Sequence, residues 1–251
     1  MDQKKENYQF TLLDEYLRKT GNIFFRWRSY IPLILIPLLP IKMHDLQRTF
    51  SNQYAEIVYQ ALCLLISFIG ELVRILTIAF VPSGTSGRNT KAQRATALNT
   101  TGAYSITRNP LYLGNFLIIF GISLFSRSWE IVIINSLLFT IFYVPIILTE
   151  EHFLLDKFGD KFSEYTSRVP CFFPRFHLWT SAGSKWNWGM VIRREYSSLF
   201  SLMLSFVLVA HLRLYAINGE ATLSLSWLVA GGVFMSMWLI VRILRLLKGC
   251  K

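Results

Sequence analysis

The chain has 251 residues, of which 53% are hydrophobic and 16% are charged. A soluble domain of this length cannot bury so large an apolar fraction, so lipid must cover part of it. The formal net charge is +11, but the basic residues flank apolar stretches instead of clustering in a polar domain, which argues against a nucleic-acid-binding protein.

The apolar residues occur in stretches whose length matches a bilayer. A helix needs about 20 residues to cross a hydrocarbon core of about 30 Å, and its backbone groups must be paired within the helix. The sequence therefore predicts an all-α fold, a polytopic membrane helical bundle of about six transmembrane helices. The predicted spans are Ile23–Ile41, Ala55–Val81, Leu111–Phe125, Trp129–Leu148, Leu199–Ile217 and Leu223–Leu244.

Two local features of these spans carry further predictions. Ser126, Arg127 and Ser128 separate the third span from the fourth, and so short a connection predicts a tight helical hairpin across the membrane. Within the second span, Glu71 and Arg74 stand three residues apart and are expected to pair along one helix face.

Lysine and arginine residues indicate the orientation of the spans. With a cytoplasmic N-terminus, most of them fall in cytoplasmic segments, and the outside loops keep Lys42, Arg48 and Arg127. This is the positive-inside asymmetry of membrane proteins. We therefore expect an integral, multi-pass membrane protein with both termini on the cytoplasmic side.

The chain is expected to divide into three parts. Residues 1–81 contain an N-terminal amphipathic segment and two spans, residues 82–176 form a core with the hairpin, and residues 177–251 contain an interfacial linker and two C-terminal spans. Residues 150–198 mix charged and aromatic side chains, which favours interfacial segments on the cytoplasmic side. The apolar face expected on the N-terminal segment consists of Phe10, Leu13, Tyr16 and Leu17.

The most informative stretch runs from Thr101 to Gly114 and reads TGAYSITRNPLYLG. Taken locally, it starts a helix, with Asn109 as the N-cap and Pro110 as the first helical residue. Gly114 would then be a small residue where another helix approaches. This local interpretation leaves Arg108 unexplained, because an ionisable group costs about 2.5–3.5 kcal/mol if it enters the hydrocarbon.

Glu150 and Glu151 follow the fourth span. Adjacent carboxylates at a helix end can be solvated flanks, but the hairpin returns these two to the membrane face of Arg108, Tyr104 and Tyr112. Such a pocket suits S-adenosylmethionine: Arg108 or backbone N–H groups would hold its carboxylate, a glutamate its ammonium, and the tyrosine rings its sulfonium. No metal is needed, because the sulfonium is already an activated leaving group.

Three elements occur in order along residues 82–176. They are Gly-x-Tyr-x-x-x-Arg-x-Pro-x-Tyr-x-Gly from Gly102 to Gly114, the Glu150–Glu151 pair, and Phe-Gly-x-x-Phe-x-x-Tyr-x-x-x-Val-Pro-x-Phe-x-Pro from Phe158 to Pro174. Together they resemble the isoprenylcysteine carboxyl methyltransferase and phospholipid methyltransferase superfamily. The resemblance implies an S-adenosylmethionine site built from the Arg-x-Pro-x-Tyr region and the glutamate pair, and a lipid acceptor that enters laterally from the bilayer. The charge asymmetry places this site on the cytoplasmic side.

On this resemblance, Arg108 and Glu151 are the expected catalytic residues. The family usually has His where this chain has Asn109, whose amide does not titrate near neutral pH, so that position is expected to contact the cofactor instead of accepting a proton. Residues Arg88, Lys91 and Arg94 are expected to attract an anionic headgroup of the substrate, although they also fit an ordinary positive flank. The expected cofactor-binding residues are Tyr104, Arg108, Asn109, Pro110, Tyr112, Gly114, Glu150 and Glu151.

The expected activity is S-adenosylmethionine-dependent methyl transfer to a membrane lipid or lipid-linked carboxylate, amine or phosphate. One alternative is an NADPH-dependent membrane reductase of sterol-reductase type, since such enzymes carry a similar Arg-His-Pro-x-Tyr segment, but the glutamate pair and the proline-rich tail favour the methyltransferases. The other alternative is a non-catalytic membrane scaffold, for which Asn109 is the hint. The identity of the acceptor and the oligomeric state do not follow from the sequence.

Overall fold

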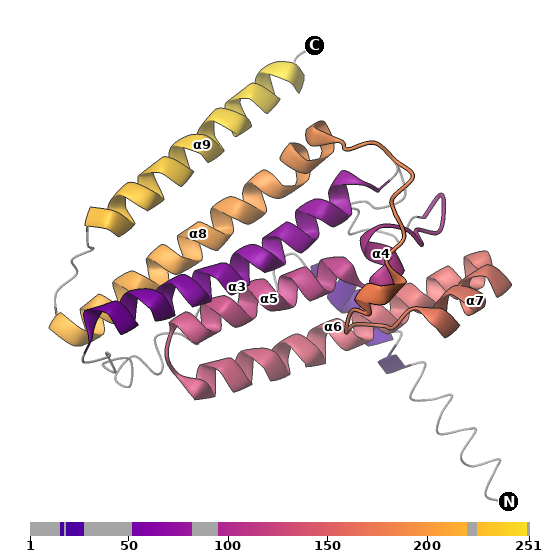
Figure 1. Cartoon of the computed structure of the whole chain (residues 1–251), viewed down its shortest axis with the longest axis horizontal. Coiled ribbons are helices and arrows are strands. Elements are labelled where there is room, and N and C mark those ends of the chain that lie inside the picture. Colours follow the sequence, from indigo (N-terminus) through magenta and orange to yellow (C-terminus); the bar gives the residue numbers. More distant parts are fainter. Residues whose placement is uncertain (1–15, 18, 28–51, 82–94, 220–224, 250–251) are drawn as a thin grey trace, which may run out of the picture.

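The computed structural model describes residues 16–17, 19–27, 52–81, 95–219 and 225–249 of the chain. These residues form an all-helical membrane bundle, as the sequence predicts (Figure 1). Residues 19–27 are helical. The further helices are α3 (Gln53–Ala79), α4 (Ala103–Ile106), α5 (Pro110–Phe125), α6 (Trp129–Phe158), α7 (Asp160–Arg168), the 3-10 helix η3 (Phe176–Leu178), α8 (Trp188–Asn218) and α9 (Leu225–Gly249).

The length and composition of the helices agree with several of the predicted spans. The described helices long and apolar enough to cross a membrane are Gln53–Ala79, Trp129–Phe158, Trp188–Ile217 and Leu225–Leu247, and α5 is a shorter apolar helix. The four long helices correspond, in this order, to the second, fourth, fifth and sixth predicted spans, and α5 corresponds to the third. Both α6 and α8 are longer than predicted because they continue from the apolar stretch into polar ends. The first predicted span lies mostly outside the described residues.

The hairpin between α5 and α6 is confirmed. The hydroxyl of Ser126 donates to the carbonyl oxygen of Ser123 at 2.6 Å, where α5 ends. The hydroxyl oxygen of Ser128 accepts from the backbone N–H of Ile131 at 3.4 Å and caps α6. Hydroxyl side chains thus satisfy backbone groups at both helix ends, and α6 returns to the membrane face where α5 begins.

A stripe of small residues brings α3 against α5. A Cβ atom at Gly70 would lie 2.6 Å from the carbonyl oxygen of Gly114, and one at Gly121 would lie 2.2 Å from Oγ of Ser67. Small residues let helix backbones approach closely in lipid, where the hydrophobic effect does not drive helices together. Gly114 therefore lies at a helix interface, as the local interpretation of the motif predicts.

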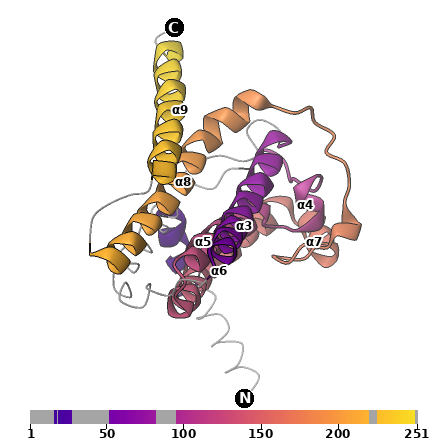
Figure 2. The ribbon, with the colours of Figure 1, turned by 60° about the vertical axis from the view of Figure 1, so that its left-hand side comes forward.

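The C-terminal helices form the outer side of the bundle. Helix α8 packs on α3 and α5, and α9 packs on α8. Figure 2 shows α9 standing apart from α3, α5 and α6. The most apolar stretch of α9 is 0% buried inside the protein. So exposed an apolar helix requires a lipid environment.

The N-terminal helical residues lie against α6. A Cβ atom at Gly21 would lie 2.3 Å from the carbonyl oxygen of Pro145, and the buried Phe25 joins an apolar cluster with Tyr112 and Tyr143. The sequence predicts a boundary near residue 22 between a surface helix and the first span, whereas the helix is continuous from residue 19 to residue 27. Phe10 and Leu13 of the predicted apolar face lie outside the described residues.

Candidate active site

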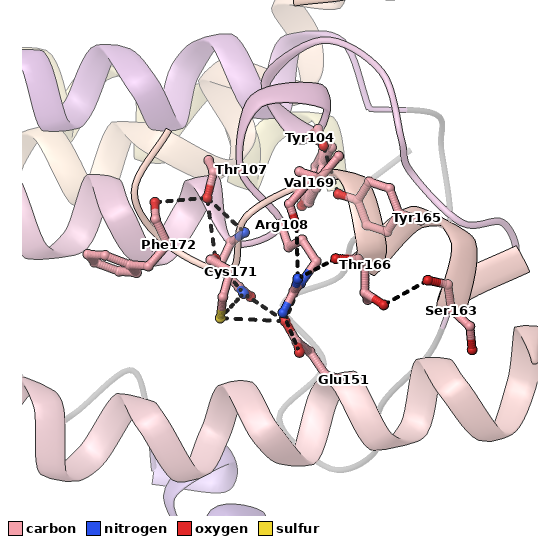
Figure 3. Close-up of polar contacts among 11 residues, drawn as sticks. Tyr104, Thr107, Arg108, Glu151, Ser163, Tyr165, Thr166, Val169, Cys171 and Phe172 are labelled. Atoms are coloured by element: carbon pink, nitrogen blue, oxygen red, sulfur yellow. Dashed lines mark hydrogen bonds and ion pairs between the residues drawn. The ribbon is translucent and has the colours of Figure 1, made fainter. Parts of the chain in front are cut away.

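Arg108 precedes α5, and its guanidinium is held on two sides (Figure 3). Nε and Nη2 donate to the two carboxylate oxygens of Glu151 at 2.8 and 3.0 Å, and Nη1 donates to the carbonyl oxygens of Val169 and Thr166 at 2.8 and 3.2 Å. Burial lowers the pKa of Arg108, but the hydrogen bonds and charge of Glu151 more than offset this, so the pKa is raised. Arg108 is therefore a permanent cation in a fixed orientation.

Asn109 occupies the N-cap position of α5, and Pro110 is its first residue. The side chain of Asn109 does not cap the helix, contrary to the local interpretation of the motif. Its Nδ2 instead donates to Oε1 of Glu151 at 3.3 Å and to the carbonyl oxygen of Cys171 at 3.0 Å. The amide of Asn109 therefore donates to the same carboxylate, that of Glu151, as Arg108 does.

The two adjacent glutamates of α6 face different partners. They lie inside a continuous helix that runs on to Phe158, and successive residues of a helix are rotated by about 100°. Glu151 thus reaches Arg108 and Asn109, while Glu150 accepts a hydrogen bond from the hydroxyl of Tyr112 at 2.9 Å. These contacts contradict the interpretation of the pair as solvated flanks.

Backbone hydrogen bonds hold the motif against the tail that follows α7. Three N–H groups donate across the two segments at 2.9 Å each, and their order shows that the segments run antiparallel. The hydroxyl of Thr107 adds a bond to the carbonyl oxygen of Phe172 at 2.9 Å. The pairs, donor first, are Gly102 with Thr180, Arg175 with Ile106 and Arg108 with Pro170. The proline-containing tail therefore positions Arg108.

Two neutral phenols lie beside this charged cluster. Tyr165 of α7 donates to the carbonyl oxygen of Tyr104 in α4 at 2.7 Å. Burial and then the charge of Glu150 raise the pKa of Tyr104, and Arg194 of α8 opposes this. Burial is also the main reason why the pKa of Tyr165 is raised. Both side chains are therefore uncharged over the physiological range.

Cys171 lies in the site although it was not among the expected site residues. Its Sγ is 3.6 Å from Oε1 of Glu151 and 3.6 Å from Nδ2 of Asn109. Burial and then the charge of Glu151 raise the pKa of the thiol, and Arg108 opposes this. The spacing of the cysteines does not predict that Cys171 belongs to the site. The sequence feature that could have indicated it is the Val-Pro-x-Phe-x-Pro tail in which Cys171 lies.

The structure thus gathers most of the expected site residues. Arg108, Asn109, Tyr112, Glu150 and Glu151 meet in one hydrogen-bonded cluster. Tyr104 lies beside it and Pro110 begins α5, whereas Gly114 faces α3. Arg88, Lys91 and Arg94 lie outside the described residues. In the part of the chain that the structure describes, no three His, Cys, Asp or Glu side chains form a group that could hold a metal ion.

These features define an integral membrane protein with a charged site where two helices meet the proline-containing tail. Residues 59–161 match the phospholipid methyltransferase family. This match, together with the similarity to an isoprenylcysteine methyltransferase, confirms the resemblance to membrane methyltransferases seen in the sequence.

Three relatives show how far the similarity extends. The nickel-cobalt-cadmium resistance protein NccN of Alcaligenes xylosoxydans xylosoxydans is 31% identical over 62% of this chain and 66% of its own length. The cobalt-zinc-cadmium resistance protein CzcN of Cupriavidus metallidurans is 40% identical over 33% of this chain and 38% of its own length. The protein-S-isoprenylcysteine O-methyltransferase of Schizosaccharomyces pombe is 30% identical over 50% of this chain and 54% of its own length. The chain thus spans about two thirds or less of each relative. No solved structure matches it.

Proposed function

We propose that the chain transfers a methyl group from S-adenosylmethionine to a membrane lipid or lipid-linked acceptor. The match of residues 59–161 to the phospholipid methyltransferase family supports methyl transfer at a membrane. The observation that carries the proposal for this site is the hydrogen-bonded cluster of Arg108, Glu150 and Glu151. When bound, S-adenosylmethionine supplies a methyl group on a positively charged sulfur, so the protein has to align the acceptor and exclude water.

The charges of the cluster fit this methyl donor. Glu150 and Glu151 are two carboxylates and Arg108 is one cation bound to Glu151, so these three side chains carry a net negative charge. The cation of Arg194 near Tyr104 reduces this charge. S-adenosylmethionine carries a carboxylate, an ammonium and a sulfonium, which leaves an excess of positive charge. These opposite charges attract more strongly in a partly dry site than in water. The neutral rings of Tyr104 and Tyr112 would add attraction for a cation.

Glu150 is the residue we propose for the ammonium group. Arg108 engages both carboxylate oxygens of Glu151. Glu150 lies beside the rings of Tyr104 and Tyr112, which suit a cationic group. Arg108 has five N–H groups, and the contacts described above engage all of them except one on Nη2. We therefore propose that Arg108 chiefly holds Glu151 and the tail in place and offers that N–H to the carboxylate of the cofactor.

The acceptor is proposed to arrive through the bilayer. Exposed apolar side chains of α6 face the lipid, and the same helix carries the two glutamates. The relative from Schizosaccharomyces pombe is named for the O-methylation of an isoprenylcysteine, so a lipid-linked oxygen is one candidate acceptor. The distribution of lysine and arginine supports a site on the cytoplasmic side.

The first test is calorimetric binding of S-adenosylmethionine and S-adenosylhomocysteine to detergent-purified protein. A hydrogen bond to a charged group contributes about 1.5–3 kcal/mol. Glu150→Gln is therefore expected to raise the Kd by roughly tenfold or more. Radiolabelled methyl transfer to lipid extracts would then identify the acceptor.

Glu130→Gln is the matched control, because it removes the same charge from an exposed position at the other end of α6. It is expected to leave the Kd unchanged. Well-folded wild-type protein that binds neither compound would overturn the proposal. Binding of NADPH instead would favour the reductase alternative.

A further inference from the structure

Arg74 of α3 joins three helices inside the membrane bundle. Its Nε and Nη2 donate to the carboxylate of Glu195 in α8 at 2.8–2.9 Å, and its Nη1 donates to the side-chain oxygen of Asn115 in α5. Glu71 lies 3.8 Å from Arg74, which confirms the pair expected on α3, but Glu195 is the nearer partner. Glu71 and Glu195 are 1% and 4% exposed. Charges buried this deeply are costly, which points to a role beyond packing.

The contact with Arg74 fixes the orientation of the Asn115 amide. Arginine only donates hydrogen bonds, so the amide oxygen of Asn115 has to face it. The amide nitrogen is thereby turned toward α6, where it donates to the hydroxyl oxygen of Tyr143 at 3.4 Å. Arg74 therefore determines which group of Asn115 meets Tyr143.

Tyr143 connects this contact to the candidate active site. It is 2% exposed and stacks on Phe139 with the ring centroids 4.1 Å apart. The ring of Tyr112 meets it edge-on with the centroids 5.2 Å apart, and the hydroxyl of Tyr112 donates to Glu150. Because a close-packed interior transmits small shifts, movement of Tyr143 would displace Tyr112 and the hydrogen bond that orients Glu150.

Gly114 provides the space that this connection needs. A Cβ atom at position 114 would lie 2.6 Å from Cγ of Arg74 and 2.7 Å from the carbonyl oxygen of Gly70. A larger residue would therefore push the Arg74 side chain away from Asn115. The path of Arg74 accounts for a glycine at this position of the motif without any contact to a ligand.

We infer that Arg74 is a positioning residue that orients the Glu150 carboxylate through Asn115, Tyr143 and Tyr112. Its ion pair with Glu195 makes α8, which lies outside the matched residues 59–161, part of that support. The inference rests on the proposed function, because it takes Glu150 as the residue that binds the ammonium group of the cofactor.

Tyr143→Phe in the 251-residue chain is the sharpest test, because it removes one hydroxyl and keeps the ring. Calorimetry with S-adenosylhomocysteine would give the Kd, and thermal melting would give the stability. We expect the Kd to rise roughly threefold to tenfold, as loss of one hydrogen bond allows. Asn115→Ala should give a similar rise, and the double variant should add little to it, since both act in one chain of contacts.

Tyr59→Phe is the matched control. Its hydroxyl also bonds between helices, to the carbonyl oxygen of Leu124 at 2.7 Å, but at the other end of the α3–α5 pair. It should lower the melting temperature and leave the Kd unchanged. If Tyr143→Phe does the same, the contacts are purely structural and the inference is overturned. If folded wild-type protein binds no S-adenosylhomocysteine, the proposed function itself fails and the inference falls with it.

Discussion

Glu151 of α6 binds the guanidinium of Arg108 through both of its carboxylate oxygens, at 2.8 and 3.0 Å. The two side chains are 18% and 16% exposed, so water screens the pair only in part. Arg108 also binds two carbonyl oxygens of the segment around Val169. The pair therefore joins α6, the start of α5 and the proline-containing tail, and its loss should loosen all three.

Arg108→Lys should destabilise the protein by about 1–3 kcal/mol, because a single ammonium cannot reproduce the two-point contact with Glu151 and the two carbonyl bonds together. Thermal melting in detergent would measure this. Arg168→Lys is the matched control, since Arg168 and Glu164 form an ion pair that is 71% and 66% exposed. That change should stay within about 0.5 kcal/mol. Equal effects of the two substitutions would contradict a special role for Arg108.

Gly114→Ala should cost about 1–3 kcal/mol, because the added methyl group meets Arg74 and the backbone of Gly70 at distances that force both to move. In Gly232→Ala the added methyl group has no atom within 4 Å, so the variant should be neutral or gain up to about 1 kcal/mol from helix propensity. Melting curves of both variants would decide the point. If Gly114→Ala behaves as Gly232→Ala does, the α3–α5 interface is looser than the structure indicates.

The helices and the meeting of Arg108 with the glutamates could be predicted from the sequence for a physical reason. A bilayer sets the length of an apolar helix, and the three-residue connection Ser126–Ser128 forces α6 back to the face where α5 starts. This short connection brings Arg108 and the two glutamates to one membrane face, whatever the packing of the other helices. Pro110 similarly marks the start of α5, because proline fits the first turn of a helix.

The contacts that could not be predicted depend on packing or on backbone atoms. The carbonyl oxygens of Thr166 and Val169 bind Arg108, but every residue has such an oxygen, so no side-chain pattern marks them. The pairing of Arg74 with Glu195 depends on how α8 lies against α3. Asn109 was expected to cap α5, but its side-chain amide donates a hydrogen bond to the carboxylate of Glu151 across the site instead.

Cys171 should react slowly with a neutral maleimide at pH 7. Burial and the nearby charge of Glu151 raise the pKa of its thiol, so less reactive thiolate is present than at an ordinary cysteine, and the rate should keep rising beyond the pH where a free thiol levels off. Glu151→Gln should lower this pKa and speed the reaction at pH 7. The measurement is labelling followed by mass spectrometry in a Cys250→Ser background, in which Cys63 stays buried.

Protection of Cys171 would test its place beside the cofactor. If S-adenosylhomocysteine binds in the cluster, it should slow labelling further in wild-type protein and have no effect in Glu150→Gln at the same concentration. Unchanged labelling of wild-type protein by saturating S-adenosylhomocysteine would argue that the ligand lies away from Glu151 and Asn109.

The orientation in the membrane can be tested at the two ends of α3. Asn52 caps one end of this 27-residue helix, which is about 40 Å long and therefore able to cross the bilayer. The backbone N–H of Asn187 bonds to the carbonyl oxygen of Ala79 at 3.0 Å, which holds the segment before α8 at the other end. Gly183 is exposed in that segment, and a side chain there would have no atom within 4 Å.

Asn52→Cys and Gly183→Cys should therefore be labelled by a membrane-impermeant maleimide from opposite sides. With the site on the cytoplasmic side, Gly183→Cys should react in inverted membrane vesicles and Asn52→Cys in right-side-out vesicles, in a background with Cys171 and Cys250 replaced by serine. The reverse result would invert the orientation expected from the sequence and leave the bundle intact, because the positive-inside preference acts on orientation and not on helix packing. Labelling of both positions from one side would instead contradict the crossing of the membrane by α3.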